Sequence, residues 1–276
     1  MPDLLHSVRD ALAPRYRVDR RLGRGGMATV FMAESIADDR LVAVKVLRPE
    51  VARFLGPDRF RREVEFLRRL HHPGIVPVLE SGEAGALLYL VMPYVAGENL
   101  RMRLQREGQL PLRVVLEVAR DVAAALDYAH GRNVLHRDIK PENVLLDESR
   151  SLVCDFGLAR AIDRAALEPL SSSGLVIGTP AYMSPEQAMA QESLGPACDI
   201  YALGCVLYEM LTGEPPFTGP TAQAVIARHL SQPPRSILAV RPDLPARVEA
   251  AVFAALAKTP GERPGSGARM IERLGA

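Results

Sequence analysis

The chain has 276 residues, and its 34 basic and 33 acidic side chains give a net charge of +1. With 48% hydrophobic and 24% charged residues, the composition is that of a globular protein large enough to bury a core. A charge so close to neutral creates no long-range field that would attract nucleic acid or an anionic membrane, so we expect neither as a partner.

The cysteines and the hydropathy pattern favour a cytoplasmic protein. Cys154, Cys198 and Cys205 are scattered and fit no metal-binding spacing, so we expect reduced thiols. The uncharged run 84–97 contains two glycines and a proline and is too short to span a bilayer. The N-terminus lacks the pattern of a signal peptide. We therefore predict no membrane segment in this chain.

The first part of the chain reads as mainly β. A short amphipathic helix is predicted in residues 1–15, and a longer helix in 58–70 carries Glu63 close to its apolar stripe. Alternating or β-branched runs predict strands at residues 17–22, 29–34, 41–47, 75–81 and 86–92. The glycine-rich turn Gly23-Arg24-Gly25-Gly26 joins two strands, which argues against a dinucleotide-binding fingerprint because that motif opens a helix.

After a linker at residues 93–97 the pattern becomes helical. A helix is predicted from Pro111 to the glycine at 131, and an almost wholly apolar helix at 200–211 marks the centre of a domain. Short strands are expected at 144–146 and 152–153, a long loop at 158–185, and helices with proline-rich turns beyond 221. The predicted fold class is α+β in two lobes: a small antiparallel β lobe with one helix (1–94) and a larger, mainly helical lobe (95–276).

Polar side chains of complementary chemistry gather in residues 136–143 and in Asp155-Phe156-Gly157. Asp138 can accept a proton from a hydroxyl nucleophile, and Lys140, two residues on, points to the same side of an extended segment. Asn143 and Asp155 offer the oxygen ligands that suit Mg²⁺. A base, a cation and two metal ligands predict phosphoryl transfer. The alternative is a solvated polar loop, which is disfavoured because all these residues occur together at this spacing.

These motifs resemble the catalytic domain of bacterial, eukaryotic-like serine/threonine protein kinases, and the resemblance covers about residues 16–274. It implies transfer of the γ-phosphate of ATP to serine and threonine hydroxyls of protein substrates, with Mg²⁺ or Mn²⁺ as the metal. Asp138 would be the base, Lys140 would neutralise the γ-phosphate, and Asn143 and Asp155 would hold the metal. Lys45 would hold the α- and β-phosphates.

The resemblance also implies how the nucleotide is held. Glu63 would orient Lys45, and Ala28 departs from the glycine usual at the third position of the turn. Pro93 lacks an N–H, but the family uses the carbonyl of this position and the N–H of Val95. The implied cofactor-binding residues are Leu22, Gly23, Gly25, Gly26, Val30, Ala43, Lys45, Met92, Pro93, Val95 and Leu145.

Further motifs imply structural support and regulation. Ser184-Pro185-Glu186 resembles the end of the activation segment, with Glu186 paired to Arg263, and Asp199 would bind the catalytic-loop backbone. Arg137 would bind a phosphate group on that segment after the segment is autophosphorylated. The candidate acceptors are Ser171, Ser172, Ser173 and Thr179.

Two other functions are weighed against this one. A nucleotide-binding pseudokinase or scaffold is disfavoured because Lys45, Asp138 and Asp155 are all present. A small-molecule phosphotransferase is disfavoured by the Ser184-Pro185-Glu186 motif after a long serine-containing segment. Formation of a homodimer is left open.

Overall fold

The computed structural model describes residues 4–156 and 180–275. The described residues form two compact units, one of residues 4–71 and 76–96 and the other of 72–75, 97–156 and 180–275. The candidate phosphate acceptors Ser171–Ser173 and Thr179 lie outside the described residues.

The first unit is built on a five-stranded antiparallel sheet with the order β1-β2-β3-β5-β4. The strands are β1 (Tyr16–Arg24), β2 (Ala28–Ser35), β3 (Leu41–Leu47), β4 (Glu80–Ala84) and β5 (Leu87–Pro93). The strand predicted at 75–81 was wrong, because Pro77 lies in its middle and has no N–H for a ladder. Ile75 instead makes an isolated bridge with Val153.

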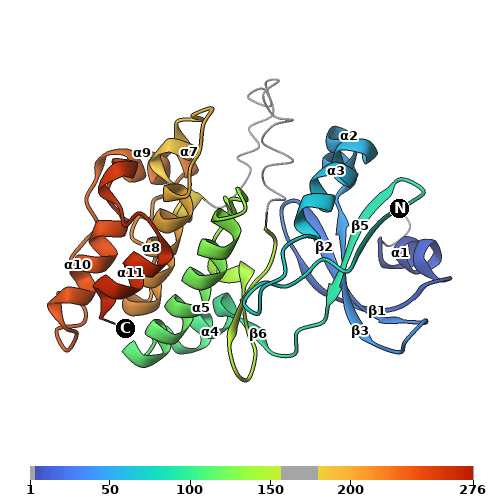
Figure 1. Ribbon diagram of the computed structural model, residues 1–276, viewed down its shortest axis with the longest axis horizontal. Helices are drawn as coiled ribbons and strands as arrows, with labels where there is room; N and C mark the ends of the chain where they lie inside the picture. The colour runs from blue at the N-terminus through green and yellow to red at the C-terminus, as the bar shows by residue number, and fades with distance from the viewer. Residues whose placement is uncertain (1–3, 157–179, 276) are drawn as a thin grey trace. The chain divides into compact units, whose positions relative to one another are not determined.

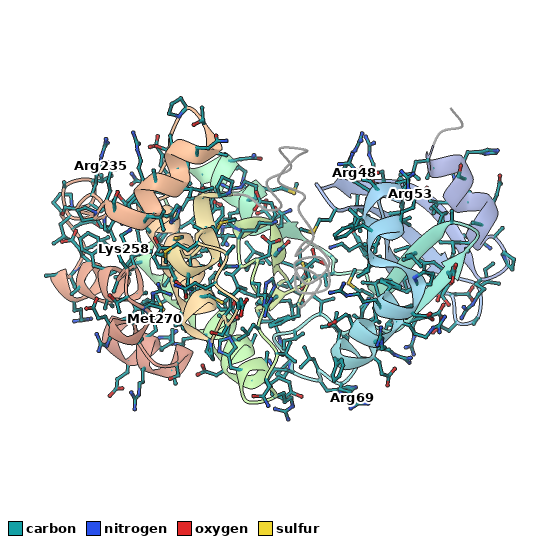
Figure 2. All side chains as sticks on the ribbon, turned by 90° about the horizontal axis from the view of Figure 1, so that it is seen from above. Arg48, Arg53, Arg69, Arg235, Lys258 and Met270 are labelled. Carbon is teal, nitrogen blue, oxygen red and sulfur yellow. The ribbon has the colours of Figure 1, made fainter. Side chains whose placement is uncertain are left out.

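Within the part of this unit that the structure describes, three helices accompany the sheet, although the predicted lobe contained one besides the lead-in helix. The lead-in helix is α1 (Leu4–Leu12), which packs on β1 and buries Val8 and Leu12 (Figure 1). The unpredicted helix is α2 (Pro49–Leu55), and Gly56 with φ 73° separates it from α3 (Pro57–Leu67). Figure 2 labels Arg53 and Arg69, which are exposed on α2 and just beyond α3.

The second unit is mainly helical and confirms the predicted central helix. Every residue of α8 from Cys198 to Leu211 is buried, and α5 and α10 pack against α8 and α11 (Figure 1). Figure 2 labels Met270, which is buried on α11. The helices are α4 (Leu100–Glu107), α5 (Leu112–His130), α7 (Pro185–Ala188), α8 (Ala197–Thr212), α9 (Ala222–Ser231), α10 (Ala246–Ala255) and α11 (Gly267–Leu274).

A three-stranded sheet of β6 (Glu98–Asn99), β7 (Val144–Leu146) and β8 (Ser151–Val153) completes the second unit. Short 3-10 turns precede β7 and α7, namely η1 (Pro141–Asn143) and η3 (Pro180–Tyr182), and η4 (Pro260–Glu262) precedes α11. Among the described residues no helix has the length and hydropathy needed to cross a lipid bilayer.

Candidate active site

One face of the five-stranded sheet collects four of the predicted nucleotide-binding residues. Val30 of β2 lies opposite Lys45 of β3, and Ala43 of β3 lies opposite Met92 of β5. Opposed residues share a face, and Ala43 and Lys45 are two residues apart on one strand, so all four side chains project to the same side. Lys45 is only 9% exposed. The opposite face carries an apolar core cluster that includes Val44.

The glycine-rich turn between β1 and β2 is held by hydrogen bonds to its backbone groups. Gly25 N–H donates to the carbonyl of Ala28 at 2.8 Å, and Arg48 donates to the carbonyl of Gly26 at 3.1 Å. A Cβ added at Gly23 or Gly26 would meet no described atom within 4 Å. The turn therefore has a defined backbone conformation and open space beside it, into which a ligand can approach.

The remaining residues predicted near the nucleotide are spread over several elements. Leu22 lies on β1, Pro93 ends β5, and Val95 follows it half-buried. Leu145 lies on β7 of the second unit. Glu63 is half-buried on α3, and its pairing with Lys45 stays a prediction.

The β7–β8 hairpin brings the two predicted metal ligands to one end of a small sheet. Val144 pairs with Val153, and the N–H of Cys154 donates to the carbonyl of Asn143 at 3.0 Å. Asn143 directly precedes β7, and Asp155 follows β8 with Cys154 between them. The antiparallel register therefore sets Asn143 and Asp155 at the same end of the hairpin. Both offer hard oxygen ligands.

Asp138 lies at the centre of the polar contacts in the predicted catalytic loop. Lys140 Nζ is 2.6 Å from Asp138 Oδ2. The amide nitrogen of Asn143 donates to the Asp138 carbonyl at 2.8 Å and to Oδ2 at 3.2 Å. Because the Asn143 nitrogen is engaged in this way, its amide oxygen is the atom suited to a metal. The structure thus joins three of the predicted residues in one cluster.

Asp199 of α8 fixes the backbone that leads into this loop, as expected from the sequence. Its carboxylate is fully buried and accepts from the N–H of His136 at 2.9 Å and of Arg137 at 2.7 Å, while His130 Nε2 lies 2.8 Å away. Burial alone would raise the pKa of Asp199, but the hydrogen bonds from His130 and from the His136 N–H outweigh it and hold the pKa below its usual range.

His136 links the loop to the residue before Asp155. Its Nδ1 accepts from the N–H of Asp138 at 3.2 Å, so Nε2 carries the proton and donates to the carbonyl of Cys154 at 2.8 Å. The ring is fully buried and packs edge-on against Phe156, with the centroids 4.6 Å apart. These contacts fix the two predicted segments relative to each other within the second unit.

The predicted pair of Glu186 and Arg263 is confirmed as a buried, two-pronged ion pair with distances of 2.7 and 2.8 Å. Burial opposes the charge of Glu186, but hydrogen bonds from Arg263 outweigh it and keep the pKa of Glu186 below its usual value. Ser184 and Gln187 form a capping box at α7, and Gln187 Nε2 also donates to the Arg137 carbonyl at 2.8 Å. The Ser-x-x-Gln spacing is a helix-start signal that the sequence analysis missed.

The family model described as the protein kinase domain matches residues 16–271 of this chain. The chain belongs to the protein kinase family.

Relatives of known name agree with this family. The chain is 42% identical over 267 residues to serine/threonine-protein kinase PknB of Mycobacterium tuberculosis, covering 94% of this chain and 42% of that protein. It is 38% identical over 278 residues to serine/threonine-protein kinase pkn3 of Myxococcus xanthus, covering 96% and 50%. The chain therefore spans half or less of the length of these relatives.

A solved structure supports the predicted fold. The crystal structure of Rad53 1–466 in complex with AMP-PNP matches with a TM-score of 0.80 at 24% identity, covering 95% of this chain and 66% of that one. The protein kinase fold predicted from the sequence is thereby confirmed.

Proposed function

We propose that this chain is a protein serine/threonine kinase that transfers the γ-phosphate of ATP to hydroxyls of protein substrates. The observation that carries the proposal is the cluster in which Lys140 and Asn143 both contact the Asp138 carboxylate. A carboxylate beside a cation can accept a hydroxyl proton while the cation offsets charge on the phosphate. The names of PknB and pkn3 support serine and threonine as acceptors.

In this mechanism Asp138 orients the acceptor hydroxyl and takes its proton as the oxygen attacks the γ-phosphorus, and the bond from that phosphorus to the bridging oxygen breaks so that ADP leaves. Lys140 stabilises negative charge on the transferred group. The Asn143 hydrogen bond to the Asp138 carbonyl keeps the base in place. The Asn143 and Asp155 oxygens would hold Mg²⁺, with Mn²⁺ as the alternative, and the bound metal would neutralise phosphate charge.

The nucleotide-binding part of the proposal draws on the first unit. The backbone of the Gly23–Gly26 turn would lie over the phosphates, and Lys45 would bind the α- and β-phosphates. Val30, Ala43 and Met92 share a sheet face with Lys45, so an adenine ring on that face would meet apolar side chains. The nucleotide analogue in the Rad53 crystal structure supports ATP as the cofactor of this fold.

Regulation by autophosphorylation is part of the same proposal. Arg137 holds its backbone in a left-handed conformation, with φ 68°, while Asp199 and Gln187 bind its N–H and carbonyl. We expect its guanidinium to form an ion pair with the phosphate group on phosphorylated Ser171, Ser172, Ser173 or Thr179. A cytoplasmic location and a homodimer remain hypotheses.

The test is the intact mass of the purified chain after incubation with ATP and Mg²⁺, with and without a protein substrate. We expect phosphate increments on the wild type and none on Asp138→Asn or Lys45→Met. Asp243→Asn, which changes an exposed carboxylate, is the matched control and should behave as the wild type. If the wild type binds ATP but transfers phosphate neither to itself nor to the added protein substrate, the result would contradict the kinase assignment and favour the pseudokinase alternative.

A further inference from the structure

Arg101 of α4 makes contacts with three separate elements of the second unit. Its Nε donates to Glu142 of η1 at 2.9 Å, and its Nη1 donates to Glu209 of α8 at 2.5 Å. Its Nη2 donates to the hydroxyl of Tyr182 in η3, and that hydroxyl donates to Glu209. One guanidinium thus joins a helix, the turn that carries Asn143, the central helix and the turn that precedes α7.

Arg101, Glu209 and Tyr182 form the more buried part of this network, and Glu142 lies at its more exposed edge. The side chains of Arg101 and Glu209 are 22% and 3% exposed, and Tyr182 is 4% exposed. Burial lowers the pKa of Arg101, but the hydrogen bonds to Glu209 and Glu142 outweigh this and raise it, so the guanidinium stays charged. Burial and the adjacent Glu209 raise the pKa of Tyr182, so its hydroxyl stays protonated and can donate.

Arg101 partly offsets the negative charge of the two carboxylates in this network. One guanidinium and two carboxylates leave a net charge of −1, and removing Arg101 would leave −2 on a pair of carboxylates of which Glu209 is 3% and Glu142 40% exposed. Glu142 already has one buried oxygen, Oε2, without a hydrogen-bond partner among the described residues. The contact with Arg101 Nε is therefore the hydrogen bond that holds this carboxylate.

We propose that Arg101 is a positioning residue for the proposed phosphoryl transfer. It acts through Glu142, the residue between Pro141 and Asn143, and so fixes the turn that presents Asn143 to Asp138. This inference rests on the proposed function. A planar guanidinium can serve three acceptors in fixed directions, whereas a lysine ammonium is a compact charge that cannot reach all three.

The experiment compares Arg101→Ala, Arg101→Lys and Glu142→Ala with the wild type. Arg106→Ala is the matched control, because Arg106 lies on the same helix and makes an exposed ion pair with Glu98. Glu142→Ala guards against misfolding, since it leaves the Arg101–Glu209–Tyr182 contacts in place. The readouts are kcat with casein as the probe substrate, ATP affinity by calorimetry, and hydrogen exchange of the amides in residues 136–144.

We expect Arg101→Ala and Glu142→Ala each to lower kcat by about 100-fold, because a displacement of about 1 Å at a reacting group costs that much. ATP affinity should change less than about threefold, and Arg101→Lys should lose roughly tenfold in kcat. Millimolar guanidinium should partly restore Arg101→Ala and not Glu142→Ala. Exchange should rise in residues 136–144 and stay slow in α5 and α8.

Two results would overturn the inference. One is a kcat of Glu142→Ala within about twofold of Arg106→Ala, the size expected for a change at an exposed ion pair. The other is unchanged exchange of residues 136–144 in both Arg101→Ala and Glu142→Ala. If the wild type itself transfers no phosphate, the proposed function fails, but the exchange measurement still decides whether Arg101 fixes the loop.

Discussion

Replacing Asp199 by asparagine tests how strongly the central helix holds the catalytic loop. The wild-type carboxylate accepts from His136 N–H and His130 at Oδ2 and from Arg137 N–H at Oδ1. An amide has one acceptor oxygen, so its best orientation keeps the two contacts at Oδ2 and turns its NH₂ toward the Arg137 N–H. At least one buried donor then loses its acceptor and faces another donor.

The magnitude follows from this count of contacts. A buried donor left without a partner costs about 1–3 kcal/mol, and loss of the ionised group adds to this, so we expect Asp199→Asn to lower the free energy of unfolding by about 2–4 kcal/mol. Asp199→Ala would strand all three donors at about 3–9 kcal/mol, which approaches the whole stability of a domain. Asparagine is therefore the variant that can be measured.

The assay is urea unfolding at neutral pH, together with kcat. Asp243→Asn is the control, because Asp243 is 62% exposed and its ion pair with Arg241 should contribute no more than about 1 kcal/mol. Release of the Arg137 amide, directly before Asp138, should also lower kcat. A stability of Asp199→Asn within about 0.5 kcal/mol of the control would refute the claim that these hydrogen bonds anchor the loop.

Two further predictions concern the helical unit. Burial, followed by the nearby Lys258 charge (labelled in Figure 2), lowers the pKa of His229 to about 4. In the unfolded chain the His229 imidazole takes up a proton near pH 6.5, whereas in the folded chain it does so near pH 4. The free energy of unfolding should therefore fall by up to about 3 kcal/mol as the pH drops from about 6.5 to about 4. Unfolding of His229→Gln, measured against pH, should lack this part of the loss. A Cβ on Gly267 would come within 2.6 Å of the Ala123 carbonyl oxygen, whereas one on Gly261 would meet nothing within 4 Å. Thermal unfolding should therefore show Gly267→Ala to be less stable by about 1–3 kcal/mol and Gly261→Ala to be nearly neutral; equal effects would contradict the steric argument.

The parts that could be predicted from the sequence are those in which short-range patterns decide the outcome. The β-branched, apolar run 41–47 predicted β3, and the apolar run 200–211 predicted the buried α8. The polar residues of the catalytic loop are separated by few positions, so their spacing predicted that Asp138, Lys140 and Asn143 lie close together.

The parts that could not be predicted depend on long-range contacts or on single breaks. The Arg101 network joins residues 41, 81 and 108 positions apart, and none of them lies in a pattern that marks the others. The helix α2 was missed because its seven residues are too few for a clear periodicity before the break at Gly56. The strand expected at 75–81 fails at Pro77, although its apolar residues fit a strand.

The catalytic loop shows why the distant contacts matter for function. Arg137 and Asp155 both adopt φ 68°, a left-handed conformation that costs a non-glycine residue roughly 1–2 kcal/mol. Such a conformation persists only where surrounding contacts determine it. At Arg137 these contacts are Asp199 on the N–H and Gln187 on the carbonyl, from two different helices. The residue just before Asp138 is thus held from outside the loop, and this hold helps to preorganise the base for proton transfer.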